Sequence, residues 1–309
     1  MKVNTFRADT HSIDKNTGEY RDPLMRWPLR GAAFTNEVGE ALRPLIGEYA
    51  TICWAPALMY IGADIYDKYK NDNTEYSPDS KRLLKQAIFQ GMASILLPLV
   101  AVKAGQNIFS VISRFGKDKI SINSKEQVSK AAETFIENGQ MQAYSDKEEE
   151  CIGTFLKRVH NVIDFRKQEK NTKNPFSKAW NKIETSTFKL LNINNESLDK
   201  YANSTIQDLI EKRKNLLNPS EEFKASKIYH NYINGLNKGQ TKDVAIKSAL
   251  TKFQQQKMLK GRTLKTIGGF IALGSLIKPI DHFVDNIVIG KVLGPGIDNY
   301  ESIKERKNK

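Results

Sequence analysis

Residues 87–102 read AIFQGMASILLPLVAV, sixteen consecutive residues without a charge. After Lys103 the chain continues through ten more uncharged residues, 104–113. A bilayer core requires about 20 mostly apolar residues in a helix, whereas runs of about 10–14 are typical of buried helices or interfacial segments. The stretch therefore predicts a membrane-spanning helix. Pro98 agrees with this prediction, because proline is more frequent in transmembrane helices than in soluble ones.

Two further apolar runs lie on either side of this stretch. Residues 49–63, YATICWAPALMYIGA, carry no charge, and extending them to 44–65 admits only Glu48 and Asp64. Residues 266–277, TIGGFIALGSLI, are shorter and precede Pro279. The third run suits a tilted span, a re-entrant segment or half of a span that turns at the proline. The sequence thus predicts an all-α fold with a multi-pass membrane module of about three apolar helices.

The competing interpretation is a soluble helical bundle whose core helices are apolar on all sides, since the length thresholds overlap. Small residues within the runs favour the membrane, because they let helices pack closely in lipid. Aromatic residues near the ends of the first run favour it too, as anchors at the membrane surface. The small residues are Gly91, Ala93, Ser94, Gly268, Gly269, Ala272, Gly274 and Ser275, and the aromatic ones are Trp27, Tyr49, Trp54, Tyr60 and Tyr66.

Charge separates the rest of the chain from these runs. The 309 residues include 48 Lys or Arg and 35 Asp or Glu, a net charge of +13. The stretch from Arg114 to Arg262 alone holds 28 basic and 18 acidic residues, a surplus of +10, with helical spacing of apolar residues and no run long enough to span a bilayer. We expect a polar tail (1–26), the first part of a membrane module (27–116), an inserted soluble basic helical domain (117–261), the last membrane segment (262–298) and a charged tail (299–309).

Nothing in the sequence indicates secretion or an enzyme. Residues 1–26 carry four acidic residues and no apolar stretch, which disfavours a cleavable signal or a mitochondrial presequence. Two cysteines do not make a disulfide framework, and the four histidines are scattered. No metal, phosphate-loop or dinucleotide motif is present. We therefore expect no catalytic, cofactor-binding or metal-binding residues.

Carboxylates at the ends of the apolar runs are the more informative polar residues. Asp64 and Asp67 share a helix face, as do Asp281 and Asp285. Charged groups at membrane depth are costly and are kept where they pair or face a cavity. We interpret them as interhelical pairs or interfacial groups that fix helix depth, with a proton or ion path as the alternative.

Four short motifs resemble one known family. They are Asn36-Glu37-Val38-Gly39-Glu40-Ala41, then Ala63-Asp64-Ile65-Tyr66-Asp67-Lys68, then Gln90-Gly91-Met92-Ala93-Ser94 with Pro98, and Lys278-Pro279-Ile280-Asp281 with Val284-Asp285. Their order and spacing resemble the mitochondrial fission process protein family, also called the mitochondrial 18 kDa protein family. The resemblance covers about 27–116 and 262–298, and the insert has no counterpart. The chain departs from the family at Phe34-Thr35, where the family has an aromatic residue and alanine, and at Lys278, where it has histidine.

The resemblance implies an integral inner-membrane protein without catalytic activity, linked to fission and membrane integrity. In a bacterial chain the corresponding role is organisation of the cytoplasmic membrane. The positions carried over are Asn36, Glu37, Gly39, Glu40, Asp64, Asp67, Lys68, Gln90, Pro98, Pro279, Asp281 and Asp285. The predicted partner is the lipid bilayer, and the basic insert favours anionic lipid headgroups or an acidic protein partner.

The alternative function is a soluble basic helical protein that binds nucleic acid or an acidic partner. The net charge and interleaved aromatic residues such as Phe165, Phe176, Trp180, Tyr229 and Tyr232 support it. The basic residues of the insert are mixed with acidic ones and form no arginine stripe or known binding motif. Nucleic acid is therefore the disfavoured partner.

Overall fold

The computed structural model describes residues 24, 26–71, 78–115, 119–144, 147–169 and 195–297. In these residues every regular element is a helix, which confirms the predicted all-α class. Residues 1–23 and 25 of the predicted polar tail, the whole predicted tail 299–309, and residues 170–194 of the predicted insert lie outside the described part.

The chain divides into two units. Unit 1 comprises Met1–Ile108 and Thr263–Lys309, and unit 2 comprises Phe109–Arg262. The predicted inserted domain, 117–261, lies inside unit 2. Both boundaries between the units fall within helices, namely α5 (Leu97–Ile112) and α13 (Lys242–Phe283).

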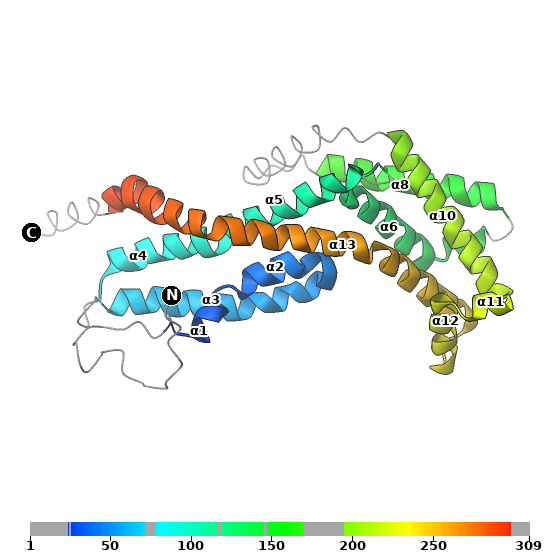
Figure 1. Cartoon of the computed structure of the whole chain (residues 1–309), viewed down its shortest axis with the longest axis horizontal. Coiled ribbons are helices and arrows are strands. Elements are labelled where there is room, and N and C mark those ends of the chain that lie inside the picture. The colour runs from blue at the N-terminus through cyan, green and yellow to red at the C-terminus, as the bar shows by residue number, and fades with distance from the viewer. Residues whose placement is uncertain are drawn as a thin grey trace, which may run out of the picture. The chain divides into compact units, whose positions relative to one another are not determined.

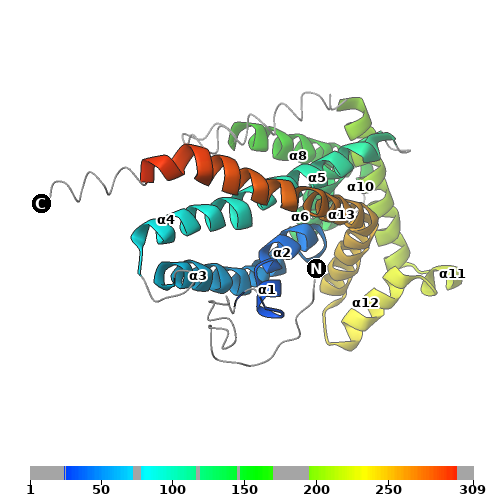
Figure 2. The same ribbon diagram turned by 60° about the vertical axis from the view of Figure 1, so that its left-hand side comes forward.

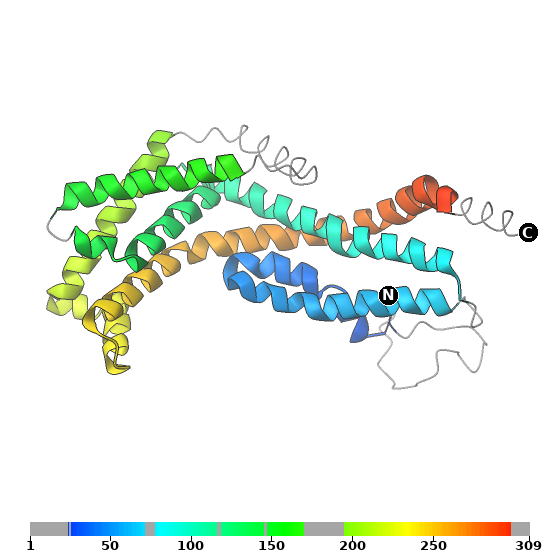
Figure 3. The same cartoon turned by 180° about the vertical axis from the view of Figure 1, so that it is seen from behind.

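Unit 1 is built from helices that run back and forth beside one another. In the views of Figure 2 and Figure 3, α2 and α3 form an antiparallel pair, and α4 lies antiparallel to α3. The elements, labelled in Figure 1, are α1 (Leu29–Ala32), α2 (Thr35–Ile46), η2 (Gly47–Cys53), α3 (Trp54–Lys70), α4 (Ser80–Phe89), η3 (Gln90–Leu96), the first part of α5, the second part of α13, and η5 (Val284–Leu293).

The first apolar run differs from the prediction. Residues 44–65 do not form one spanning helix, because α2 ends just before Gly47, whose φ of 60° is a left-handed value that favours glycine. The 3₁₀ turn η2 follows, and α3 then runs for 17 residues. The predicted three apolar helices are therefore two long helices and one helical hairpin, α2–η2–α3, among the described residues.

The two long helices are continuous through their prolines. One runs from Ser80 to Phe115, 36 residues, and contains a π-helical turn, η3, just before Pro98. The other runs from Lys242 to Ile297, 56 residues, and passes Pro279 without a break. Both are long and apolar enough to cross a membrane. Residues 266–277 therefore belong to a helix that continues beyond the proline.

Unit 2 is a helical domain with one apolar core. Its elements are the end of α5, η4 (Ser113–Phe115), α6 (Ile122–Glu137), α7 (Gln140–Ala143), α8 (Glu148–Glu169), α10 (Asn195–Leu217), α11 (Glu221–Lys224), α12 (Lys227–Asn237) and the start of α13. Twenty buried residues form the core, among them Phe135 and Phe155, whose rings meet edge to face at 5.6 Å. Serine side chains cap α6, α11 and α12, which satisfies backbone N–H groups at their first turns.

Candidate functional site

Unit 1 buries polar side chains where a soluble domain would bury apolar ones. Seven polar residues are each at most 6% exposed, and they come from α2, α3, η3, α5 and α13. We call them the buried polar network: Asn36, Glu37, Glu40, Asp64, Gln90, Gln106 and Thr266. Buried polar groups need partners, so the contacts of this network decide what it does.

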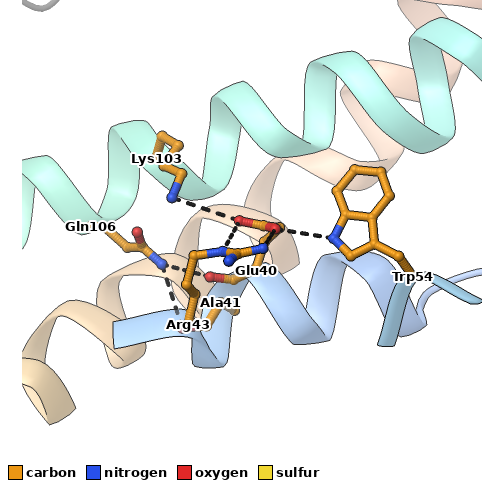
Figure 4. Close-up of polar contacts among 6 residues, drawn as sticks. All are labelled: Glu40, Ala41, Arg43, Trp54, Lys103 and Gln106. Carbon is orange, nitrogen blue, oxygen red and sulfur yellow. Dashed lines mark hydrogen bonds and ion pairs between the residues drawn. The ribbon is translucent and has the colours of Figure 1, made fainter. Parts of the chain in front are cut away.

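Glu40 is the centre of the first cluster, which Figure 4 shows between α2, α3 and α5. Its Oε2 accepts a hydrogen bond from Arg43 Nε at 2.8 Å, and Lys103 Nζ lies 3.6 Å from the same oxygen. Its Oε1 accepts hydrogen bonds from Trp54 Nε1 at 3.0 Å and from Arg43 Nη2. Burial alone would raise the pKa of Glu40, but the hydrogen bonds from Arg43 and Trp54 and the nearby positive charges outweigh it and lower the pKa. Glu40 is therefore ionised at neutral pH.

A proline in α2 leaves a backbone carbonyl for this cluster to satisfy. Pro44 has no N–H, so it cannot donate to the Glu40 carbonyl four residues earlier. Gln106 Nε2, on α5, donates to that carbonyl at 2.9 Å, and lies 3.4 Å from the Ala41 carbonyl as well. The side-chain amide of one helix thus replaces the missing backbone donor of another.

The same arrangement occurs in the opposite direction around Pro98. This residue cannot donate to the Ser94 carbonyl, four residues before it. Asn36 Nδ2, on α2, donates to the Ser94 carbonyl at 2.7 Å. The two helices are therefore joined reciprocally, each by an amide that bonds a carbonyl freed by a proline in the other. Neighbouring helices satisfy proline-freed groups in this way where water is excluded.

Asp64 is the centre of the second cluster. Its Oδ2 accepts hydrogen bonds from Gln86 Nε2 and from Gln90 Nε2, the latter at 2.5 Å. Ser94 Oγ donates to Gln90 Oε1 at 2.6 Å. Gln86, Gln90 and Ser94 are four residues apart and so share one helix face. A polar stripe on an otherwise apolar helix thus faces α3.

Glu37 is a buried carboxyl on α2, outside the two long helices. Burial, and next the negative charge of Asp281, raise its pKa to about 8. Glu37 is consequently protonated at neutral pH, in contrast to Glu40 one turn later. Beside it in sequence, Asn36 Oδ1 is buried and has no hydrogen-bond partner within the described residues.

Small residues bring the helices of unit 1 into close contact. A Cβ atom at Gly105 would collide with the Gly268 carbonyl oxygen and lie 2.6 Å from Ala272 Cβ. A Cβ atom at Gly269 would lie 3.4 Å from Ala41. Close backbone approach through Gly and Ala is the way helices pack when lipid, not water, surrounds them.

The predicted motif positions divide into two sets. Asn36, Glu37, Glu40, Asp64 and Gln90 are in the network, and Pro98 frees the carbonyl that Asn36 binds. Gly39 allows close contact, because a Cβ there would lie 2.6 Å from Cys53 Cβ.

The remaining positions lie outside the network. Asp67 accepts from Asn71 Nδ2 at 3.0 Å, and the Lys68 carbonyl accepts from Arg82 Nε at 3.2 Å. Pro279, Asp281 and Asp285 are exposed.

Five residues that contribute to these clusters are not among the twelve predicted motif positions: Arg43, Trp54, Gln86, Lys103 and Gln106. The spacing of Gln86, Gln90 and Ser94 was a usable signal, since a four-residue polar repeat inside an apolar run indicates an inward-facing stripe. Arg43, Trp54 and Gln106 had no comparable local signal. Their roles depend on which helix each one meets.

The network is suited to holding helices together. The part of the chain that the structure describes contains no group of three His, Cys, Asp or Glu side chains placed to hold a metal ion. No family model, no curated protein and no solved structure matches this chain.

Proposed function

We propose that this chain is an integral membrane protein that organises or maintains an inner or cytoplasmic membrane without catalysing a reaction. The apolar parts of the two long helices cross the bilayer, the α2–η2–α3 hairpin packs against them, and unit 2 is a basic helical domain outside the bilayer. The observation that carries the proposal is the inverted polarity of unit 1. Of 25 large apolar residues that are exposed among the described residues, 21 belong to unit 1 and four to unit 2.

In water this arrangement would be unfavourable in two ways. Exposed large apolar side chains lose the benefit of burial in water, and buried carboxyl groups lose hydration. In lipid both features are favourable, because apolar side chains face acyl chains and polar ones face the helix bundle. Only 28% and 22% of the most apolar 18-residue windows of the two long helices are buried, which is unlike the core helices of a soluble bundle.

The spacing of charges along the helices supports the same placement. Lys85 and Lys103 enclose 17 uncharged residues, 86–102. At about 1.5 Å per residue these extend over about 26 Å, close to the hydrocarbon thickness of about 30 Å. In the second long helix, Lys265 and Lys278 enclose only 12 uncharged residues, 266–277, which extend over about 18 Å, so the first long helix carries this argument.

The proposed role in membrane organisation rests on the resemblance to the mitochondrial fission process family. Six of the twelve positions that carry the resemblance are network residues or the proline that Asn36 complements, so they concentrate where the helices are joined. The proposed location is the bacterial cytoplasmic membrane, or the mitochondrial inner membrane in a eukaryote. The rival function, a soluble protein that binds nucleic acid or an acidic partner, would leave the 21 exposed apolar residues in water.

Extraction of membranes with alkaline carbonate and high salt tests the membrane placement. The full chain should stay in the pellet, because salt removes only proteins held by surface charge.

A matched pair of variants on α13 sharpens the test. Ile271→Lys, at a position 52% exposed in unit 1, should impair insertion by about 2.5–3.5 kcal/mol if it lies near the bilayer centre. Val244→Lys, at a position 48% exposed in unit 2, should insert normally. Release of the wild type, or equal behaviour of the two variants, would contradict the proposal.

Membrane organisation is tested separately in the organism that carries the gene. Cells without the protein should have a more permeable membrane, measured by entry of a dye that intact cells exclude. The wild-type gene and the Val244→Lys variant should restore the barrier, whereas Ile271→Lys should not. Unchanged permeability would reject the organising role and leave the membrane placement intact.

A further inference from the structure

The cluster around Glu40 contains more positive than negative charge. One carboxylate faces two cations, Arg43 and Lys103. Both carboxylate oxygens are already occupied by donors from Arg43 and Trp54. A guanidinium has five N–H donors and an ammonium three, so the cations have more donors than Glu40 accepts. The cluster therefore keeps a net charge of +1 and unused donor capacity.

The positive groups of this cluster, and not its carboxylate, reach the surface. The side chains of Arg43 and Lys103 are 32% and 34% exposed, against 6% for Glu40. Figure 4 shows both cations pointing toward the Glu40 carboxylate, Arg43 from α2 and Lys103 from α5. Glu40 thus holds two cations from different helices close together, and the face that remains open is basic. Lys265, on α13, is close enough for its positive charge to repel that of Lys103.

These cations lie at one end of each of the two uncharged segments of unit 1, 86–102 and 266–277. Lys103 directly follows the uncharged residues 86–102, and Lys265 directly precedes the uncharged residues 266–277. Trp54, which bonds the same Glu40, has the amphipathic ring typical of the membrane surface. In a bilayer the phosphate groups of lipids lie at the ends of the apolar segment, where Arg and Lys attract anionic headgroups.

We propose that Arg43 and Lys103, positioned by Glu40, form a binding site for an anionic phosphate group, with Lys265 adding positive charge. Arginine binds phosphate oxygens through two parallel hydrogen bonds, and lysine adds a point charge. The site belongs to unit 1 and is separate from the basic insert. The inference rests on the proposed function for the lipid headgroup as the source of that phosphate.

The test uses the full chain in a neutral detergent and measures its thermal stability. Two ligands are added separately, a diacyl phosphatidylglycerol and inorganic phosphate, with phosphatidylcholine as the zwitterionic control. The wild type should be stabilised by phosphatidylglycerol more than by phosphatidylcholine. A response to phosphatidylglycerol alone assigns a lipid headgroup, and a response to inorganic phosphate as well assigns phosphate from either source.

Variants locate the site. Arg43→Gln and Lys103→Gln should each weaken the response about tenfold in ligand concentration, because a charge-assisted hydrogen bond is lost. Lys103→Arg should retain it, which separates loss of binding from loss of folding. Lys278→Gln removes one charge at the other end of residues 266–277 and should respond like the wild type. No response of the wild type to either ligand, or an equal loss in Lys278→Gln, would overturn the inference.

The two proposals fail in different ways. Release of the wild type by carbonate with the phosphate response intact would reject the membrane placement but not the site. Retention in the pellet without any phosphate response would reject the site but not the membrane placement.

Discussion

Unit 1 and unit 2 are both helical, and they distribute polarity in opposite ways. Unit 2 buries Phe135, Phe155 and eighteen other core residues, and none of its described charged residues is among the buried ones. Unit 1 buries Glu37, Glu40 and Asp64, and its two apolar clusters contain three buried residues each. Helix formation is the same in both, because it needs only local hydrogen bonds. What differs is where the charged and the large apolar side chains lie, and the proposed function explains this difference by water around unit 2 and lipid around unit 1.

The means of joining helices differ accordingly. In unit 2 large side chains interlock, which removes apolar surface from water. Lipid is as apolar as leucine, so in the proposed bilayer environment apolar burial cannot drive the association of the unit 1 helices. There the helices meet through glycine and alanine contacts. Side-chain amides also donate hydrogen bonds to the backbone carbonyls that the prolines leave without a donor. The comparison predicts that different kinds of substitution will damage each unit.

The largest expected effect is in the core of unit 2. Phe135→Ala should lower the free energy of unfolding of this unit by about 3–5 kcal/mol, because it leaves a cavity beside Phe155. Protease resistance of unit 2 in the full chain, measured against urea concentration, reports the loss. Phe135→Leu should cost less, and Met59→Ala, at an exposed position of unit 1, should have little effect. Equal effects at Phe135 and Met59 would break the comparison.

The buried carboxyl of Glu37 should make the stability of unit 1 depend on pH. Its pKa is about 8 in the folded chain and 4.5 in the unfolded one, so its contribution is fully present below pH 4.5 and is lost as pH rises through 8. Between pH 6 and pH 9 the wild type should lose about 2–3 kcal/mol more than Glu37→Gln. Thermal unfolding in detergent at both pH values measures this.

An exposed carboxylate of unit 2 is the control for this measurement. Glu222→Gln should keep the pH response of the wild type, because Glu222 belongs to unit 2 and not to unit 1. A Glu37→Gln variant with the same pH response as the wild type would show that Glu37 is not the group that titrates.

Glycine substitutions on one helix test the close contacts of unit 1. Gly105→Ala should destabilise the unit by about 1–3 kcal/mol, since its Cβ would collide with the Gly268 carbonyl oxygen on α13. Gly91→Ala lies on the same long helix with no atom within 4 Å of its Cβ, and it should be neutral or slightly stabilising. Thermal stability in detergent compares the two. Equal losses would place the effect in the helix itself and not in the contact.

The smallest effect concerns the reciprocal hydrogen bonds from the side-chain amides of Asn36 and Gln106. Asn36→Ala should cost about 1–2 kcal/mol, because it leaves the Ser94 carbonyl unsatisfied. With Pro98→Ala also present, residue 98 regains an N–H that can bond that carbonyl, so the cost of Asn36→Ala should fall. A double-mutant cycle should give a coupling of about 1 kcal/mol. Simple additivity would mean that the amide does not replace the missing backbone donor.

The local properties of this protein follow from the sequence alone. Helical class, the long apolar helix through residues 87–102 and the basic character of the 117–261 region depend on composition and spacing within a few turns. The polar residues at the ends of the apolar runs were also recognisable, because a charge in such a run requires a partner. The break at Gly47 was not recognised, since glycine is compatible with both a continuous helix and a left-handed turn.

The partners of these residues were decided only by the tertiary structure. Asn36 and Ser94 are 58 residues apart, and Gln106 and Glu40 are 66 apart. The periodicity of the sequence predicts the apolar face of each helix, but it does not predict which two helices pack together or in which register. A proline within a helix predicts that the carbonyl four residues before it lacks its backbone donor, but the donor that replaces it comes from another helix. Lys103, which lies beside Glu40 together with Arg43, also comes from another helix. Pairing between distant segments depends on how the faces pack together, and that is a property of the folded chain.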